Sequence, residues 1–314
     1  MGQPLKNFAL SLAFVIAGFA FAPAHAGSLT RTFVSAAGDD SNPCTLTAPC
    51  RTFAGAYAAT AANGIISALD PAGYGALSIG GPITIDGNGW AAITAPSGGI
   101  GISVGAGPGD KVILTGLSID GAGTAIIGIA YSSGASLTIE NCVVRNVGIV
   151  GLQFTSDTTT PQTLAVSNSY FNNTGNTGVA ITATSSGAMT ASFNRTEFNN
   201  NNTVGLEVNG VIGTGAINVA VTDSVVANNG LGVQVQSVPA QSVVNATLTH
   251  SQVVGNGLGF AATGANATLW LAQSTVTGNT NGYGANGGVI NTYDDNYFAD
   301  NGSSGGTLTP ANKQ

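Results

Sequence analysis

Few residues of this chain are able to carry out acid, base or nucleophilic chemistry. Among 314 residues there are 7 Lys or Arg, 14 Asp or Glu, 2 His and 3 Cys. Two acidic pairs stand out, Asp39 with Asp40 and Asp294 with Asp295, and His250 is the second of the two histidines. General acid or base catalysis needs a partner within hydrogen-bonding reach of such a group. The elements that position these side chains therefore decide whether any of them act together.

The composition excludes several classes of protein. Charged residues make up 7% of the chain, whereas about a quarter is usual, and 46 residues are Gly while 43% are hydrophobic. Low charge with ordinary hydrophobicity argues against intrinsic disorder and against long surface helices. With a net charge of −7 and no basic cluster, the chain offers little to a nucleic acid or to an anionic membrane surface. We expect a protein of strands and turns that binds no nucleic acid.

Residues 1–26 have the features of a secretory signal peptide. Lys6 is the one charged residue, an apolar run covers 8–21, and Ala24-His25-Ala26 places small residues where a signal peptidase reads. The apolar run is shorter than the roughly 20 residues of a membrane-spanning helix. We therefore expect an exported mature chain, secreted or periplasmic, free or associated with the cell surface, without membrane insertion after cleavage. In an oxidising compartment a loop can join Cys44 and Cys50 as a disulfide, which leaves Cys142 unpaired.

A repeat occupies almost everything after residue 100. A Gly followed by an apolar residue, a small or polar one and usually another apolar one recurs at intervals of 23 or 27 residues. The glycines are Gly101, Gly128, Gly151, Gly178, Gly205, Gly232, Gly259 and Gly282. Such a period must be recognised before individual strands, because it sets the whole fold.

A second element lies between these glycines at a fixed offset, as in residues 164–173. It alternates apolar and polar residues, turns at a polar residue, and resumes with one inward apolar position. These positions are Val144, Phe171, Phe198, Val226, Val253, Val276 and Phe298. The alternation predicts three short strands in each repeat. Because one repeat cannot bury its own apolar face, successive repeats must stack and pair their strands in parallel.

This Asn-rich repeat resembles the right-handed parallel β-helix of the pectin lyase-like superfamily, in which turn Asn side chains stack as hydrogen-bonded ladders. Residues 38–53, followed by an Ala-rich stretch, are similar to the entry segment of secreted bacterial β-helix proteins, where that stretch forms a helix covering the first coil. The resemblance implies an all-β solenoid of about nine coils. We expect an entry and cap segment over 27–62 with its helix over 52–62, the β-helix over 63–301, and a polar tail over 302–314.

Equivalent positions in successive coils face the same way at a spacing of about 4.8 Å. One outward column then contains Ser103, Ala130, Gln153, Ala180, Glu207, Gln234, Ala261 and Gly284. A single carboxylate in this column is neither the pair that a glycosidase needs nor the group of oxygen ligands that Ca²⁺ needs. The long polar side chains of Gln153, Glu207 and Gln234, together with Tyr170 on a flat sheet, are the candidate glycan-contact residues.

The polar turn position shared by the coils offers the remaining chemistry. Its members are Asn141, Asn168, Arg195, Asp223, His250, Gln273 and Asp295. Asp223, His250, Asp294 and Asp295 are the candidate catalytic residues, and the competing interpretation is a turn ladder whose members vary. Cys142 lies in a column of mostly small residues, which favours a buried inert thiol over a nucleophile.

Asp39 and Asp40 are the candidate metal ligands. Their Gly-Asp-Asp-Ser-Asn-Pro setting is also ordinary turn chemistry, which is the favoured interpretation. We expect no cofactor, with Ca²⁺ as the alternative.

Two classes of function remain. The first is an exported non-catalytic β-helix, a cell-surface, matrix or glycan-contact scaffold whose partner is a polysaccharide or a cell-surface component. The alternative is a polysaccharide lyase, hydrolase or epimerase of the pectin lyase-like type acting on an acidic glycan. The enzymes of that superfamily use clustered carboxylates with Arg, Lys or His beside one sheet, and long loops wall the groove. This chain has no such ordered set, and its near-constant repeat leaves no long loops, which favours the first class.

Overall fold

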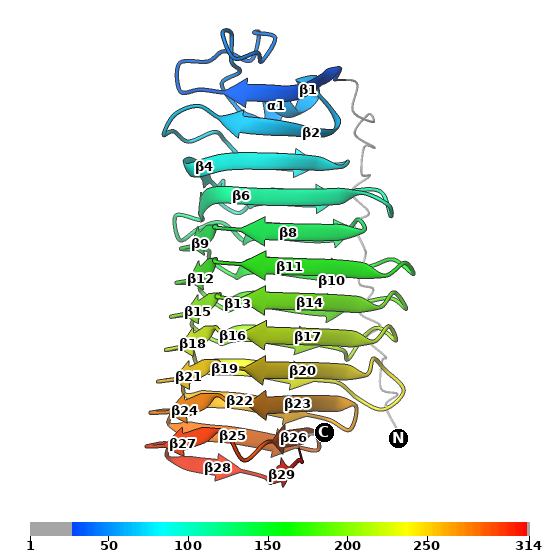
Figure 1. Cartoon of the computed structure of the whole chain (residues 1–314), viewed down its shortest axis with the longest axis vertical. Coiled ribbons are helices and arrows are strands. Elements are labelled where there is room, and N and C mark those ends of the chain that lie inside the picture. The colour runs from blue at the N-terminus through cyan, green and yellow to red at the C-terminus, as the bar shows by residue number, and fades with distance from the viewer. Residues whose placement is uncertain (1–26, 313–314) are drawn as a thin grey trace, which may run out of the picture.

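The central coils of the chain contain three strands each because apolar and polar residues alternate over three short stretches. In one central coil these strands are β10 (Val150–Ser156), β11 (Gln162–Ser167) and β12 (Tyr170–Asn172). Alternate residues of β11 are buried, so one side of the strand faces the interior and the other faces outward. The computed structural model describes residues 27–312, and their coils stack along one axis into a parallel β-helix of about ten turns (Figure 1).

Three faces surround the interior. We call the first the long face, and its strands are β1 (Leu29–Val34), β2 (Thr60–Ala68), β4 (Ile83–Thr94), β6 (Lys111–Asp120), β8 (Ser136–Glu140), β11, β14 (Met189–Asn194), β17 (Ile217–Thr222), β20 (Val244–Thr249), β23 (Ala267–Ala272), β26 (Val289–Thr292) and β29 (Leu308–Pro310). The short face contains β9 (Val143–Arg145), β12, β15 (Glu197–Asn199), β18 (Val225–Ala227), β21 (Gln252–Val254), β24 (Thr275–Thr277) and β27 (Tyr297–Ala299). These two faces form one 19-stranded sheet because β6 spans the corner and pairs with both β8 and β9.

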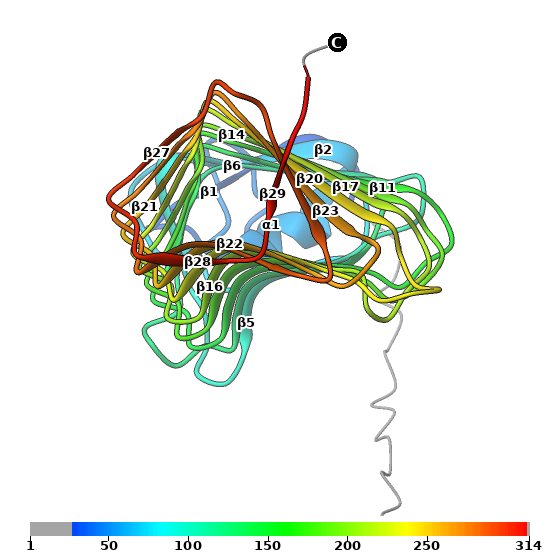
Figure 2. The same ribbon diagram turned by 90° about the horizontal axis from the view of Figure 1, so that it is seen from below.

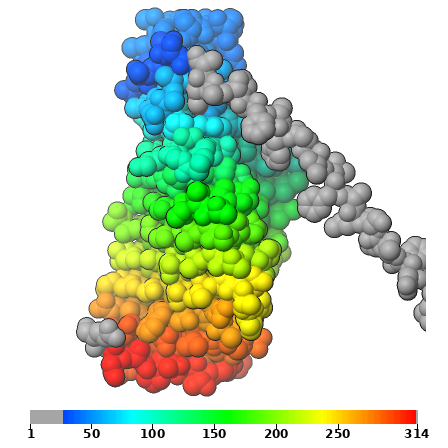
Figure 3. All heavy atoms as spheres, turned by 90° about the vertical axis from the view of Figure 1, so that its right-hand side faces the viewer, coloured from blue at the N-terminus to red at the C-terminus, as the bar shows by residue number. Residues whose placement is uncertain are grey.

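The third face is a separate sheet of ten strands, which we call the ten-stranded face. Its strands are β3 (Leu77–Ile79), β5 (Ile100–Gly105), β7 (Ile127–Ser133), β10, β13 (Thr177–Ala183), β16 (Val204–Asn209), β19 (Leu231–Gln236), β22 (Leu258–Thr263), β25 (Asn281–Asn286) and β28 (Ser303–Gly305). All named strand pairs are parallel, as the repeat predicts. The space-filling view shows the coils as successive bands of one column (Figure 3).

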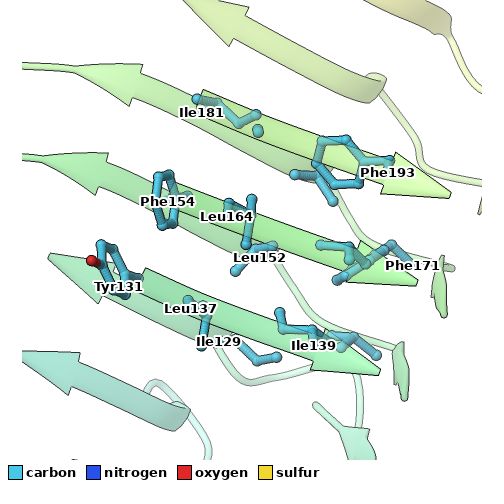
Figure 4. Close-up of a cluster of buried hydrophobic side chains, with 14 of the residues drawn as sticks. Ile129, Tyr131, Leu137, Ile139, Leu152, Phe154, Leu164, Phe171, Ile181 and Phe193 are labelled. Carbon is cyan, nitrogen blue, oxygen red and sulfur yellow. The ribbon is translucent and has the colours of Figure 1, made fainter. Parts of the chain in front are cut away.

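The core consists of like side chains stacked from coil to coil. Phe171 and Phe198 lie 6.1 Å apart with nearly parallel rings, and Tyr131 stacks on Phe154 at 4.4 Å (Figure 4). Six of the seven predicted inward positions are fully buried, and Phe298, in the last coils, is partly exposed. Burial of each large apolar side chain contributes about 2 to 3 kcal/mol, so the stack is the main source of stability.

The corner between the long and short faces is a one-residue turn in the left-handed region. The φ values are 52° for Asn141, 47° for Asn168, 47° for Arg195, 50° for Asp223, 51° for His250 and 48° for Gln273. This confirms the shared turn position for six predicted members. Asp295 is the exception, because Asp294 and Asp295 belong to a longer turn and Asp295 is not in the left-handed region.

Buried asparagines form the ladder that the resemblance implies. At the corner between the short and ten-stranded faces, each Asn amide accepts from the previous Asn and donates onward or to a backbone carbonyl. The members are Asn201, Asn229, Asn256, Asn279 and Asn301. The ladder satisfies backbone groups that the turn removes from water, which a buried corner requires.

The N-terminal end is closed by α1 (Phe53–Ala59), which Figure 2 shows within the outline of the coils. The Thr52 hydroxyl caps the helix by accepting from the N–H of Gly55, and Phe53 is buried against the first coils. The predicted helix over 52–62 is too long at its C-terminal end. Thr60 already belongs to β2, because its hydroxyl bonds to Thr32 of β1 at 2.7 Å and holds the chain extended there. The predicted disulfide between Cys44 and Cys50 is present in the entry loop.

Strand pairing reaches beyond the predicted solenoid boundaries at 63 and 301. β1, which precedes α1 in the expected entry segment, pairs with β2, which follows α1. β29 lies in the segment expected to be a polar tail and pairs with β26. Both segments are paired because the edge of a parallel coil offers free N–H and C=O groups to any neighbouring extended chain. The predicted signal peptide at 1–26 lies outside the described residues. In the part of the chain that is described, no helix is long and apolar enough to cross a membrane.

Candidate functional site

The outer side of the ten-stranded face carries the predicted column of outward residues. Strand register aligns Gln153 with Ala130 and Ala180, and Glu207 with Ala180 and Gln234. The column begins one coil earlier than expected, because Ser78 pairs with Ser103. Gln153, Glu207 and Gln234 are all partly exposed, so the fold places these three predicted glycan-contact residues on one surface. We call it the central column.

A polar column runs beside the central column, two residues further along each strand. It consists of Thr155, Thr182, Asn209, Gln236 and Thr263. Gln153 donates to the Thr155 hydroxyl at 3.3 Å, and Gln234 donates to Gln236 Oε1 at 3.2 Å. Side-chain hydrogen bonds therefore join the two columns in the coils of β10 and β19.

Glu207 is the centre of this network. Its Oε1 accepts from Asn209 Nδ2 at 3.2 Å and from Gln236 Nε2 at 2.9 Å. Both bonds end on the same oxygen, and within residues 27–312 no hydrogen bond reaches Oε2. One oxygen of the carboxylate remains available to an outside hydrogen-bond donor.

An aliphatic column runs along the other side of the central column. Its members are Ile100, Ile127, Val150, Thr177, Val204, Leu231, Leu258 and Asn281. A Cβ atom built on Gly284 of the central column would lie 3.6 Å from the Leu258 side chain, which shows that this leucine lies against the outer surface. Leu231 and Leu258 are partly exposed, whereas Thr177 and Val204 are buried.

A shallow groove continues this surface toward the N-terminal end. It has a volume of about 440 Å³ and is lined by Leu77, Ser78, Ile100, Ser103, Ile126 and Ile127, with neighbouring Ala and Gly residues. Ser78 and Ser103 belong to the central column, and Ile100 and Ile127 belong to the aliphatic column. The groove is therefore the first part of the same three-column surface.

Tyr170, the fourth predicted glycan-contact residue, lies elsewhere. It belongs to β12 on the short face, where it pairs with Val143 and Glu197, and 42% of its surface is exposed. The structure does not bring it together with Gln153, Glu207 and Gln234, because a corner separates the two faces.

The candidate catalytic residues do not form a constellation. Asp223 and His250 occupy consecutive turns, but no hydrogen bond or ion pair joins their side chains in the described chain. Asp294 is exposed, and Asp295 Oδ1 accepts from the backbone N–H of Gln273 at 3.1 Å. Each of these side chains lies in a turn between the long and short faces.

The candidate metal ligands are engaged in the entry loop. Asp39 accepts from the backbone N–H and the hydroxyl of Ser41, and these bonds hold its pKa below the usual value. Asp40 accepts from the backbone N–H groups of Arg51 and Thr52 and from the Thr52 hydroxyl, which ties the loop to the start of α1. Within residues 27–312, no three His, Cys, Asp or Glu side chains gather as a metal site would require.

Cys142 is fully buried beneath the corner, and burial raises the pKa of its thiol to about 11. Its backbone N–H donates to the Ser169 hydroxyl at 3.1 Å, as neighbouring members of the column also do. The buried environment of Cys142 therefore favours the inert thiol that the sequence predicts.

Sequence reasoning missed an aromatic pair on the long face. The rings of Trp270 and Tyr293 stack with their centroids 6.0 Å apart, and both are partly exposed. The register column of Trp270 otherwise holds small residues such as Ala220 and Thr247. The outward position of Trp270 between two buried leucines was the signal that could have revealed it.

A sequence model described as the right handed beta helix region matches residues 54–212. The chain belongs to the right-handed β-helix family. Its repeat, ladder and three faces are the features of that family rather than of one activity. Among curated proteins, none matches the sequence.

Comparison with solved structures finds proteins similar to this β-helix protein. Pectate lyase Pel9A superimposes with a TM-score of 0.59 at 15% identity, over 92% of this chain and 80% of that one. The A-module of mannuronan C-5 epimerase AlgE4 from Azotobacter vinelandii gives a TM-score of 0.44 at 13% identity, over 80% of this chain and 89% of that one. At such identities the similarity concerns the fold alone.

Proposed function

We propose that this β-helix protein is exported and binds a polysaccharide without cleaving it, through the outer side of the ten-stranded face. The observation that carries the proposal is the row of hydrogen-bonding side chains in the central and polar columns between β10 and β22. Amide and hydroxyl groups repeat there at each coil, about 4.8 Å apart, over a rigid sheet. A rigid array of this kind suits a repeating ligand because little conformational entropy is lost on binding.

The same surface lacks the parts of a glycan-cleaving site. A hydrolase needs two carboxyl groups about 5 to 9.5 Å apart, and the three columns contain one carboxylate, that of Glu207. The Oε1 of Glu207 is held by amides, and none of the column members is Lys, Arg or His. The alternative, a lyase, hydrolase or epimerase, would have to use turn residues such as Asp223 and His250, which occupy consecutive turns away from this surface.

Export is supported by two features. The signal-peptide pattern of residues 1–26 predicts secretion, and the disulfide between Cys44 and Cys50 suits an oxidising compartment. The proposed partner is a cell-surface or matrix polysaccharide.

Native gel retardation tests the proposal. The mature protein is run through gels containing neutral and acidic polysaccharides, and the same mixtures are assayed for new reducing ends and unsaturated products with and without Ca²⁺. Retardation without cleavage is the expected result. Any cleavage would contradict the non-catalytic function, and absence of retardation in every gel would contradict glycan binding.

Matched variants locate the contact. We expect the double variant Gln153→Ala with Gln234→Ala to lose most of the retardation. Gln252→Ala removes the same side chain from the short face and should leave retardation unchanged. Loss of retardation in Trp270→Ala, with no loss in the double variant, would move the contact to the long face and reject the proposed surface.

A further inference from the structure

The three columns of the ten-stranded face differ in chemistry across the width of the sheet. Leu231 and Leu258 present partly exposed aliphatic side chains on one side, and Asn209 and Gln236 present amides on the other. The columns run parallel to the solenoid axis because each is built from register-matched positions. A ligand that fits all three must be long, with an apolar side and a polar edge.

Sugar rings in a polysaccharide have this double character. Their C–H groups form an apolar surface, and their hydroxyl groups project around the ring edge as hydrogen-bond donors and acceptors. The aliphatic column is able to remove C–H surface from water, while amides bind hydroxyl groups. The Oε2 of Glu207 adds an acceptor for a hydroxyl donor, and a bond to an ionised acceptor is stronger than a neutral one.

Charge restricts which glycan is suitable. From residue 196 to residue 312 the chain contains no Lys or Arg, and its carboxylates are Glu197, Glu207, Asp223, Asp294, Asp295 and Asp300. The five basic residues in 27–312 are Arg31, Arg51, Lys111, Arg145 and Arg195, and none belongs to a strand of the ten-stranded face. Arg145 is already paired with Asp120 at 3.0 Å, and Arg195 donates to Asn168 at 2.7 Å.

A uronate-bearing chain on this face would therefore meet Glu207 with no cation to balance it. Like charges placed together repel each other, so the carboxylate of Glu207 disfavours binding of a uronate-bearing chain. Bridging by Ca²⁺ needs six to eight oxygen ligands, and one carboxylate among amides supplies few of them. The surface disfavours acidic glycans and suits uncharged ones.

We infer that the ten-stranded face selects a neutral polysaccharide, which lies along the solenoid axis with its C–H surface on the aliphatic column and its hydroxyl edge on the polar column. The inference rests on the proposed function and adds the class and orientation of the ligand. It also gives Leu231, Leu258 and Glu207 distinct roles. The leucines supply contact area, and the carboxylate supplies both a hydrogen-bond acceptor and discrimination against anions.

The first experiment compares gels containing a neutral glucan, mannan or xyloglucan with gels containing polygalacturonate or alginate. We expect retardation in at least one neutral gel and none in the acidic gels. Preferential retardation by the acidic glycans would overturn the inference and leave the proposed function standing. Absence of retardation in every gel would remove both.

The second experiment tests the aliphatic column on the neutral glycan that retards the wild type. Leu231→Asn with Leu258→Asn should weaken the dissociation constant about tenfold or more. Val243→Asn alters an exposed valine outside all strands, 51% exposed, and should have no effect. An unchanged constant in the double variant would overturn the proposed orientation. If the double variant unfolds, the single change Leu258→Asn provides the same comparison.

The third experiment tests the charge argument without removing any apolar contact. Glu207→Lys should gain retardation by polygalacturonate that disappears in about 0.5 M salt, where charges are screened beyond a few ångströms. Glu140→Lys makes the same charge change at an exposed position on the long face and should gain none. Equal gains in both variants would show an effect of net charge alone and would overturn the assignment of selectivity to Glu207.

Discussion

The side-chain nitrogen of Asn201 donates to the side-chain oxygen of Asn229 at 3.0 Å, across one full coil and inside a buried corner. The same oxygen also accepts from the backbone N–H of Asn201 at 2.9 Å. Asn229 in turn donates to the Phe198 carbonyl at 2.8 Å and to Asn256. One side chain therefore satisfies several groups from which water is excluded.

Asn229→Ala should destabilise the protein by about 2 to 5 kcal/mol, because each buried group left without a partner costs about 1 to 3 kcal/mol. Urea denaturation followed by circular dichroism measures the loss. Asn218→Ala removes an exposed amide that accepts from Asn245, and its effect should stay within about 0.5 kcal/mol. Equal losses in both variants would refute the buried ladder as a source of stability.

His250 should behave as a turn residue rather than a catalytic one. Its φ of 51° lies in the left-handed region, where a β-branched residue is disfavoured by about 1 to 2 kcal/mol and Asn is tolerated. His250→Asn should therefore keep full stability and full glycan retardation, while His250→Val should lower the free energy of unfolding. A loss of function in the Asn variant with unchanged stability would reveal a chemical role.

Asp70 should make the N-terminal end sensitive to acid. Hydrogen bonds from the Ser35 hydroxyl, the Tyr74 hydroxyl and the Ala36 N–H hold the pKa of this carboxyl below its usual value of 3.8. Because the folded-state pKa is the lower one, the stabilisation is present above the unfolded value and is lost as pH falls through the folded value.

Denaturation midpoints measured from pH 6 down to about pH 2 test this. The wild type should lose more stability over that interval than Asp70→Asn, whose side chain does not titrate. Parallel curves for the two proteins would show that this carboxyl does not contribute to the acid sensitivity.

Cys142 should resist alkylation in the folded protein. Burial raises its thiol pKa to about 11, so the reactive thiolate is scarce at neutral pH, and the side chain is fully covered. Labelling with iodoacetamide at pH 8 should proceed only at the rate of opening and become fast in denaturant. Rapid labelling without denaturant would show that the corner opens readily.

Much of the fold could be predicted from particular residues. The glycine spacing from Gly101 to Gly282 and the inward positions such as Phe171 and Phe198 predict stacked coils, because only stacking buries a repeat this short. Register then follows from the repeat itself, and the predicted central column was confirmed. Strand pairing at both ends extends past the expected bounds, since β1 and β29 carry no copy of the repeat.

The candidate site was predictable only in part. The alternation in each strand identifies Gln153, Glu207 and Gln234 as outward. The repeat does not show that the Leu258 side chain lies against the outer surface, because that depends on the path of the backbone. Tyr170 is a further candidate glycan-contact residue in the sequence, and the left-handed turns on either side of it place it on another face.

The sequence by itself determined the period, the parallel pairing and the outward alternation of this protein, because these depend on local spacing and on the need to bury apolar surface. Only the tertiary structure decided which outward residues share a surface, because the direction of each face depends on the corner turns. It also decided that Glu207 lies between amides, without a basic residue on its sheet. The residues in this arrangement are 27 to 29 positions apart in the sequence, and their side chains meet only after the chain has completed a coil.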